Sequence, residues 1–144
     1  MTNDQLTLSV AEAIDAQEAD RVFVGLKAHN EMASGRAYTR RDLAVMLRDA
    51  AGVLRAGLVG YTNWDWLYVD HLWVDDGLRR GGVGRRLLDA AEEEARARGC
   101  RWSRLYTYDF QAPGFYPKCG YTEWCRMDGY PEGHAQIWFR KPLV

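Results

Sequence analysis

Cysteine is scarce in this sequence, and its spacing excludes two kinds of site. The three cysteines, Cys100, Cys119 and Cys125, are an odd number, and no two of them form a Cys-x-x-Cys pair. This pattern argues against a disulfide framework and against a structural zinc site, and it fits a reducing compartment. We therefore expect free thiols, no bound metal and a cytoplasmic location.

An excess of charge of one sign and long apolar runs are lacking as well. The 19 lysines and arginines are balanced by 20 aspartates and glutamates, which leaves a net charge of -1. Without a basic excess the chain has no general attraction for nucleic acid or anionic lipid, so any anion site must be local. No apolar stretch approaches the roughly 20 residues that span a bilayer. We expect neither nucleic acid nor a membrane as a partner.

The remaining composition is that of an ordinary globular protein. Of the 144 residues, 47% are apolar and 27% are charged. This length suits one core that folds alone, and no internal repeat or linker interrupts it. The sequence therefore predicts a single domain over residues 1–144.

Periodicity predicts an α/β fold. Helical spacing covers residues 11–32, as one long helix or two short ones, and residues 82–98 and 112–119. Strand patterns cover residues 6–10, 42–48, 53–61, 65–74, 102–108, 121–127 and 135–141. Short turns favour antiparallel neighbours, whereas the helix at 82–98 favours a parallel crossover between the strands on either side of it. The result is a mixed, mostly antiparallel sheet of about seven strands with flanking helices.

The helix at residues 82–98 has the clearest amphipathic pattern. Its spacing predicts a buried stripe of Val83, Leu87, Leu88, Ala91 and Ala95. Charged side chains are expected mostly outside that stripe, namely Arg85, Glu92, Glu93, Arg96 and Arg98. Gly99 is placed to end the helix.

A glycine-rich segment precedes this helix. Gly81, Gly82 and Gly84 lie where the helix begins, among Arg79, Arg80, Arg85 and Arg86. The first turn of a helix offers free backbone N–H groups and the positive end of its dipole, and glycines let a phosphate approach closely. An anion site is one interpretation, and a plain turn before a helix is the other.

Two other phosphate-binding motifs do not fit this segment. The Walker motif ends in Gly-Lys followed by Ser or Thr, but Gly84 is followed by Arg85-Arg86. The dinucleotide motif requires Gly-x-Gly-x-x-Gly, and the glycines are misplaced for it.

Three blocks in order resemble the GNAT superfamily of N-acetyltransferases. Arg79-x-x-Gly82-x-Gly84 resembles its Arg/Gln-x-x-Gly-x-Gly/Ala signature, and Leu72-Trp73-Val74 resembles the Leu-x-Val that precedes it. Phe115-Tyr116, followed by Gly120-Tyr121, resembles its Phe-Tyr-x-x-x-Gly-Phe/Tyr block. The resemblance covers about residues 65–125.

The resemblance implies an acetyl-CoA-dependent N-acetyltransferase that works by direct attack in a ternary complex. In such enzymes the strands corresponding to residues 65–74 and 102–108 splay apart and admit the pantetheine arm of acetyl-CoA. The residues expected to bind pantetheine are Leu72, Trp73 and Val74. Those expected at the pyrophosphate are Arg79, Arg80, Gly81, Gly82, Val83, Gly84 and Arg85.

The resemblance also suggests proton-transfer residues. Tyr116 is at the position of the tyrosine that donates a proton to the CoA sulfur, although Pro117 directly follows it and raises the question of a kink. Asp70 is the preferred general base; because an ordinary carboxylate is a weak base for an ammonium, it needs desolvation or a bridging water. Strand alternation places Tyr68, Asp70, Leu72 and Val74 on one face, and His71 on the other, packed under a helix.

The acceptor side is less specified. Asp109 is where many such enzymes have an asparagine that contacts CoA or an ordered water, so the resemblance makes it a candidate cofactor-binding residue. His29 and His134 show no evident partner and are expected on the surface. Aromatic residues are dense near the predicted cleft, which favours a cationic amine of a small molecule. Tyr68, Tyr38 and Asn30 are the candidate acceptor-binding residues, and a homodimer is a family expectation. A non-catalytic CoA-binding sensor and a protein N-acetyltransferase are the alternatives.

Overall fold

Residues 5–144 are described by the computed structural model of the chain. They belong to two units, Met1–Tyr38 and Thr39–Val144. The prediction of one domain over residues 1–144 stays a prediction. No helix within residues 5–144 is long and apolar enough to cross a membrane.

The N-terminal unit contains helix α1, Ala16–Ser34. The helix begins at Asp15, whose carboxylate accepts hydrogen bonds from the backbone N–H groups of Gln17 and Glu18, each at 3.0 Å. It ends at Gly35, whose φ of 68° is the left-handed conformation common after helices. The sequence therefore predicted this helix correctly, but the capping aspartate starts it five residues later than expected.

The strand predicted at residues 6–10 is wrong. These residues are exposed and belong to no strand. Alternating apolar residues make a strand only when a neighbouring strand supplies the hydrogen bonds, because an isolated extended segment is not stable in water.

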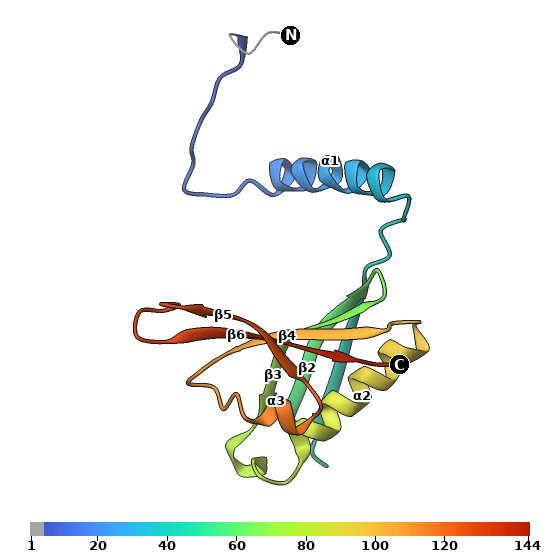
Figure 1. The fold of residues 1–144 in the computed structure, drawn as a ribbon, viewed down its shortest axis with the longest axis vertical. Coiled ribbons are helices and arrows are strands. Elements are labelled where there is room, and N and C mark those ends of the chain that lie inside the picture. The colour runs from blue at the N-terminus through green and yellow to red at the C-terminus, as the bar shows by residue number, and fades with distance from the viewer. Residues whose placement is uncertain (1–4) are drawn as a thin grey trace. The chain divides into compact units, whose positions relative to one another are not determined.

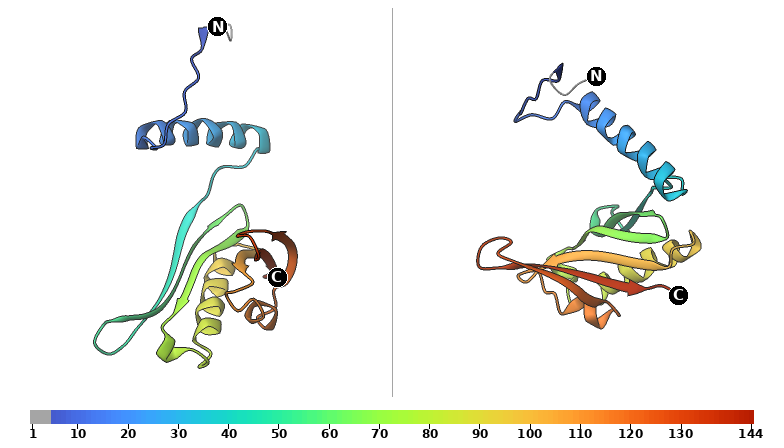
Figure 2. Two further views of the ribbon diagram at one scale, coloured as in Figure 1. Left: turned by 90° about the vertical axis from the view of Figure 1, so that its left-hand side faces the viewer. Right: turned by 45° about the horizontal axis from the view of Figure 1, so that its top comes forward.

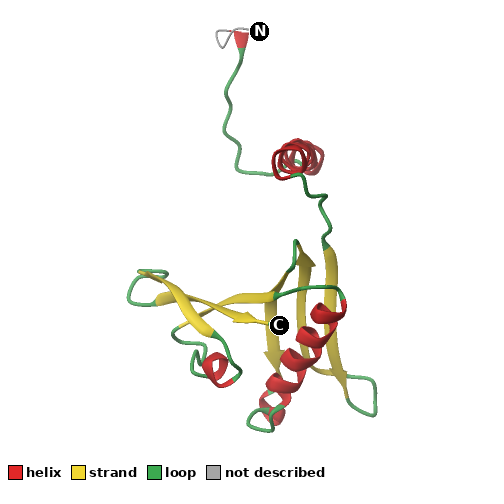
Figure 3. Ribbon diagram, turned by 45° about the vertical axis from the view of Figure 1, so that its right-hand side comes forward, coloured by secondary structure: helices red, strands yellow, loops and turns green. Residues whose placement is uncertain are grey.

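The C-terminal unit is built on a six-stranded sheet in the order β1-β2-β3-β4-β6-β5 (Figures 1 and 3). The strands are β1 Arg41–Arg48, β2 Leu54–Asn63, β3 Trp66–Val74, β4 Trp102–Tyr108, β5 Thr122–Asp128 and β6 Ala135–Pro142. All neighbours are antiparallel except β3 and β4, which are parallel. The mixed sheet is as predicted, with one strand fewer.

Helix α2, Val83–Ala97, connects β3 to β4 and packs on β1, β2 and β3, as Figure 2 shows. All five residues of its predicted stripe are buried. Arg98 attaches its end to the sheet, since its guanidinium donates to the carbonyls of Arg41 and Asp42 at 3.1 and 3.0 Å. The remaining short helices are a 3-10 turn, Asp76–Leu78, and α3, Phe115–Lys118.

One residue of α2 departs from the predicted pattern. Glu92, expected outside the stripe, is only 1% exposed, and its carboxylate lies 2.5 Å from Nζ of Lys141 on β6. Glu92 is one helical turn beyond the buried Leu88, so helix geometry places it on the core side. The lysine makes its burial tolerable, because a buried charge needs a partner.

The three cysteines are free, as their spacing predicted. Cys100 and Cys119 are buried, and Cys125 is half-buried. Residues 5–144 contain no group of three metal-ligating side chains that could hold an ion.

A β-bulge in β3 overturns the predicted distribution of side chains between the two faces. Val59 of β2 lies opposite His71, but the next residue, Gly60, lies opposite Val69, so Asp70 is the extra residue. The bulge shifts the alternation by one position. Leu72 and Val74 therefore pack against the core under α2, whereas His71 is exposed and is not packed under a helix.

Strands β3 and β4 pair over only three residues. The parallel register runs from Trp66 opposite Trp102 to Tyr68 opposite Arg104, and then stops. Beyond this point β3 stays paired with β2 and β4 stays paired with β6. The sheet therefore opens between β3 and β4, as the splayed cleft of the prediction requires.

Candidate active site

A cleft of about 1340 Å³ occupies the opening between β3 and β4. Its walls are the second half of β3, the start of α2, the second half of β4 and the segment around α3. Most of the predicted donor-binding residues line it, namely Leu72, Trp73, Val74, Arg79, Arg80, Gly82, Val83, Gly84 and Arg85. Both predicted proton-transfer residues, Asp70 and Tyr116, line it as well. Gly81 is not among the lining residues.

One wall of the cleft is an open strand edge. From His71 to Val74, β3 is paired with β2 on one side but has no strand on the β4 side. The backbone groups on the open side are hydrogen-bonding groups that require partners. An extended ligand with amide groups, as pantetheine has, fits such an edge.

The start of α2 forms the second wall. Gly82 precedes the helix at a φ of 74°, and no side chain caps the first turn. The first backbone N–H groups of a helix have no partner inside it, so those of Val83, Gly84 and Arg85 are available to an anion. Arg80 also has a positive φ, 69°, which turns the chain sharply just before the helix.

Gly84 has a packing reason to lack a side chain. A Cβ atom at this position would lie 3.3 Å from Cζ of Phe115 and 3.8 Å from Cδ2 of Leu72. The glycine thus lets the start of α2 approach both α3 and β3. Residues of the three sequence blocks of the resemblance meet at this point.

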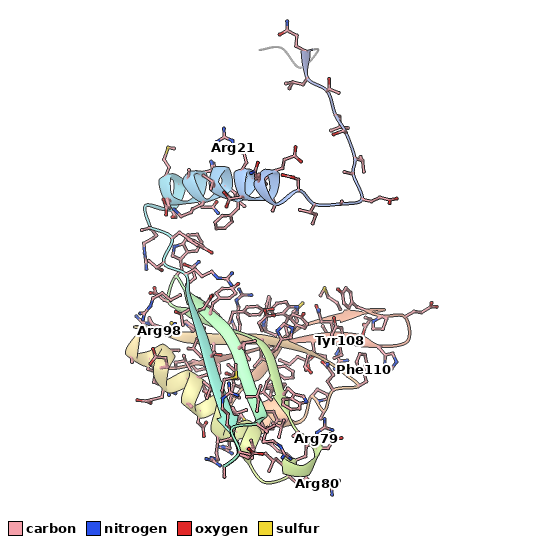
Figure 4. All side chains as sticks on the ribbon, turned by 180° about the vertical axis from the view of Figure 1, so that it is seen from behind. Arg21, Arg79, Arg80, Arg98, Tyr108 and Phe110 are labelled. Carbon is pink, nitrogen blue, oxygen red and sulfur yellow. The ribbon has the colours of Figure 1, made fainter. Side chains whose placement is uncertain are left out.

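Arginines surround the mouth of the cleft. Figure 4 shows Arg79 and Arg80 at the turn that leads from β3 towards α2. Arg79 forms an ion pair of 3.0 Å with Asp76, and Nη1 of Arg85 donates to the carbonyl of Lys118 at 3.4 Å. These cations give the uncapped helix start a positive surrounding that suits a phosphate.

Tyr116 is held in the cleft by aromatic packing. Its ring centroid lies 5.1 Å from that of Phe115, 5.7 Å from Phe139 and 6.0 Å from Tyr121. Burial, with a smaller contribution from Cys119, raises the pKa of Tyr116 to about 12. The phenol is therefore protonated at neutral pH. Within residues 5–144 its hydroxyl makes no hydrogen bond, so it is available as a donor.

Pro117 does not distort the helix that carries Tyr116. Helix α3 begins at Phe115, so the proline lies in the first turn. There the backbone N–H that proline lacks would have no partner inside the helix anyway.

Asp70 and His71 lie together at the bulge. Their side chains are 3.6 Å apart, and both residues line the cleft. Asp70 also contributes, after burial, to raising the pKa of Tyr68 to about 12. The bulge thus brings two possible proton acceptors to the start of the opening, where the sequence indicated one.

His134, expected to lack a partner, has one. Its Nδ1 lies 2.9 Å from Oδ1 of Asp109, and the other carboxylate oxygen accepts the backbone N–H of Ala135 at 3.1 Å. Asp109 does not line the cleft, and both of its oxygens fix the segment that enters β6. Its contact with CoA stays a prediction. An Asp–His pair separated by 25 positions leaves no local signal in the sequence.

Aromatic rings stack at the end of β4. The ring of Tyr108 lies between those of Phe110, at 5.2 Å, and Tyr130, at 5.8 Å, with nearly parallel planes. Figure 4 shows Tyr108 and Phe110 next to each other. Tyr108 and Phe110 line the cleft, so this stack forms an aromatic wall of the cleft.

The three predicted acceptor residues lie in different parts of the chain. Tyr68 lies on β3 and lines a second, smaller cavity together with Arg104. Asn30 and Tyr38 belong to the N-terminal unit, where the Tyr38 ring packs against Phe23 at 5.5 Å. Their role at an acceptor stays a prediction. Arg104 was missed, since a lone arginine in a strand carries no signal until its neighbours are known.

Comparison with known proteins agrees with the arrangement of this cleft. The Acetyltransferase (GNAT) domain family matches residues 34–123. Blasticidin-S acetyltransferase of Streptomyces morookaense is 51% identical over 83 residues, which are 57% of this chain and 61% of that protein. The chain thus spans less than two thirds of this relative's length.

Two further comparisons cover nearly the whole chain. Acetyltransferase Atu2258 of Agrobacterium fabrum is 32% identical over 132 residues, 92% of this chain and 96% of that protein. The crystal structure of an acetyltransferase from Agrobacterium tumefaciens superposes on this chain with a TM-score of 0.88 at 31% sequence identity. The superposition covers 95% of this chain and 99% of the other.

Proposed function

The chain belongs to the GNAT family of acetyltransferases, and we propose that it transfers the acetyl group of acetyl-CoA to a primary amine of a small molecule. One observation carries this proposal. The uncapped start of α2, the open edge of β3 and the Tyr116 hydroxyl all belong to a single cleft. These groups match, in turn, a pyrophosphate, an amide-containing arm and a thiolate leaving group.

Donor binding rests mainly on backbone groups. The first N–H groups of α2 hold the pyrophosphate, with Arg79, Arg80 and Arg85 supplying positive charge around it. The open edge of β3 at Leu72, Trp73 and Val74 pairs with the pantetheine amides. Acetyl-CoA supplies an activated acyl group as a thioester.

The reaction requires one bond to form and one to break, with two proton movements. The amine nitrogen bonds to the acetyl carbon while the carbon–sulfur bond breaks. Asp70, directly or through a water, accepts the proton that the amine loses, and Tyr116 gives its proton to the departing thiolate. Because burial raises the pKa of Tyr116 to about 12, the phenol is fully protonated at neutral pH.

Blasticidin S is the first acceptor to test. The relative that is 51% identical over 83 residues is named for its acetylation. The aromatic wall at Tyr108 and Phe110, with the carboxylate of Asp70 nearby in the same cleft, suits a cationic amine.

The deciding experiment is a screen of amines, with blasticidin S included, in which acetyl-CoA is supplied and released thiol is measured. The acetylated product is then identified by mass spectrometry. Acceptor-dependent thiol release that is lost in Tyr116→Phe supports the enzyme. Tight CoA binding without thiol release for any acceptor overturns the proposal in favour of a CoA-binding sensor. Acetylation of peptide amines alone would favour a protein N-acetyltransferase.

A further inference from the structure

A second cavity, of about 350 Å³, opens on the side of the sheet that α2 does not cover. It is lined by Tyr61, Asn63, Trp64, Trp66, Tyr68 and Arg104, and we call it the Arg104 pocket. Its volume suits one ring-sized portion of a ligand. Aromatic walls with a single guanidinium suggest a planar ligand group that accepts hydrogen bonds.

Arg104 is held in place by aromatic stacking. Its guanidinium carbon lies 4.4 Å from the ring centroid of Tyr68 and 5.9 Å from that of Trp138. One Nη atom lies 3.5 Å from the hydroxyl of Tyr61. Within residues 5–144 Arg104 forms no ion pair. Since a guanidinium has five N–H donors, most of them remain available to a ligand.

A neighbouring stacked arginine, Arg40, does have a carboxylate partner. Arg40 also stacks on Tyr61, at 3.9 Å, but its guanidinium pairs with Asp42 at 3.4 Å. Arg104 has the stacking without the carboxylate. A half-buried guanidinium without an anion favours a ligand that supplies one, or a strong oxygen acceptor.

The pocket and the active-site cleft adjoin along β3. Tyr68 lines the pocket, and Asp70, two residues further, lines the cleft. A regular strand advances roughly 7 Å over two residues, and the bulge at Asp70 makes this an upper limit for the backbone separation of Tyr68 and Asp70. The carboxylate of Asp70 and the guanidinium that stacks on Tyr68 are thus neighbours along β3.

A tight turn forms the rim of the pocket. Trp64 and Asp65 connect β2 to β3 with φ angles of 46° and 69°. Two-residue turns of this kind favour Asn-Gly, and here the first position places an indole ring among the lining residues.

We propose that the Arg104 pocket recognises a planar group of the acceptor that carries a carboxylate or carbonyl oxygen, while Asp70, two residues along β3 from Tyr68, faces the acceptor amine. The inference rests on the proposed acetyltransfer, and it narrows the acceptor to amines that carry a planar, oxygen-bearing group about one aromatic ring away from the nitrogen. Bidentate hydrogen bonds from the guanidinium and stacking on Tyr68 give the selectivity.

Three probe amines test the pocket, namely 4-(aminomethyl)benzoate, 4-(aminomethyl)benzamide and benzylamine. Each is titrated into CoA-loaded protein by calorimetry, and each is assayed for thiol release from acetyl-CoA. The variants are Arg104→Met and, as a matched control, Arg140→Met. Arg140 lies opposite Arg104 in the β4–β6 register and stacks over Trp102 at 5.7 Å, but it does not line the pocket.

The wild-type protein should bind the benzoate at least about 10-fold more tightly than benzylamine, the discrimination of about 1.4 kcal/mol expected of a charge-assisted contact. Arg104→Met should abolish this preference without changing CoA affinity or melting temperature, and Arg140→Met should keep it. The benzamide distinguishes the two oxygen types: binding equal to that of the benzoate assigns the pocket to a carbonyl, and weak binding assigns it to a carboxylate.

Equal binding of all three probes, or equal losses in the two variants, would overturn the inference. Calorimetry separates this failure from that of the proposed function. If the probes bind in a way that depends on Arg104 but none is acetylated, the result upholds the pocket and contradicts the proposed acetyltransferase activity. Acetylation of the benzoate and the benzamide that Arg104→Met leaves unchanged upholds the proposed enzyme and rejects the pocket.

Discussion

On the α2 side of the cleft the groups that face a ligand are mostly backbone amides, whereas on the other side they are side chains of β4 and of the loops that follow β4 and β5. The first side includes the uncapped helix start and the open edge of β3. The second includes the stacked rings of Tyr108, Phe110 and Tyr130, together with Arg104 in its own pocket. Backbone groups can bind the same donor with many sequences, whereas a wall of side chains changes with every substitution. The donor side is therefore suited to a common ligand, and the acceptor side to a particular one.

The largest effect is expected where the backbone itself is disturbed. Gly84→Val places methyl groups against Phe115, from which a Cβ atom would already be only 3.3 Å away. Overpacking should lower the stability of the fold by about 1–3 kcal/mol. Because it also pushes the start of α2 away from α3, we expect acetyl-CoA binding to weaken at least about 10-fold, which is 1.4 kcal/mol. Calorimetry measures the change, and melting temperature reports whether the variant still folds. Adding Phe115→Ala should restore much of the affinity; no recovery would mean that the valine acts elsewhere than on this contact.

Tyr116→Phe should lower kcat about 100-fold, the lower end of general acid–base contributions, with the Kd of acetyl-CoA unchanged. Because the pKa of Tyr116 is raised to about 12, the phenol stays protonated as the pH rises and loses its proton only near that value. Its contribution should therefore persist through pH 10 in the pH profile of kcat. Tyr121→Phe, an equally aromatic change on a neighbouring buried ring, should leave kcat nearly intact. A similar loss in both variants would indicate a packing role for Tyr116.

Asp70→Asn tests the acceptor side. We expect kcat/KM for the amine to fall about 10-fold, a modest effect because a water or His71 can partly replace the carboxylate. The affinity for acetyl-CoA should not change. His71→Gln is the matched variant, since the two side chains lie 3.6 Å apart at the same bulge. If the pH profile of kcat/KM loses its acidic limb only in His71→Gln, the histidine is the base.

The smallest effect on ligand binding is expected from a change at Asp109. This change tests whether the residue contributes to the donor side of the cleft. Asp109→Ala removes the bonds to His134 and to the backbone of Ala135, and should cost about 1 kcal/mol of stability. The Kd of acetyl-CoA should change less than about 2-fold, well under the tenfold that 1.4 kcal/mol would give. A melting curve and a CoA titration measure both quantities. A CoA affinity that falls about 10-fold would return Asp109 to the donor side, as the family resemblance suggests.

Sequence prediction was accurate for the elements from residue 41 onwards because their patterns are local. The stripe of α2 was read correctly from helical spacing, apart from Glu92, whose burial depends on Lys141 from a strand far along the chain. The prediction of a strand at residues 6–10 failed because the alternation of apolar residues describes a single segment, whereas a strand requires a neighbouring strand that supplies its hydrogen bonds. The prediction of which β3 side chains share a face failed from Asp70 onwards. One extra residue moves every later side chain to the opposite face, and it leaves no sign in the sequence alternation.

The sequence by itself was enough to predict the proposed donor side of this cleft. Glycines before a helix, a Leu-x-Val strand end and a Phe-Tyr block are local features, and backbone amides bind phosphate wherever glycine permits a close approach. Only the tertiary structure decided the acceptor side. Arg104 lies next to Tyr68 because β3 and β4 are paired there, and His134 lies next to Asp109 because a hairpin returns to the end of β4. Such neighbours are set by strand register, which is fixed by the packing of the whole sheet and not by any one segment.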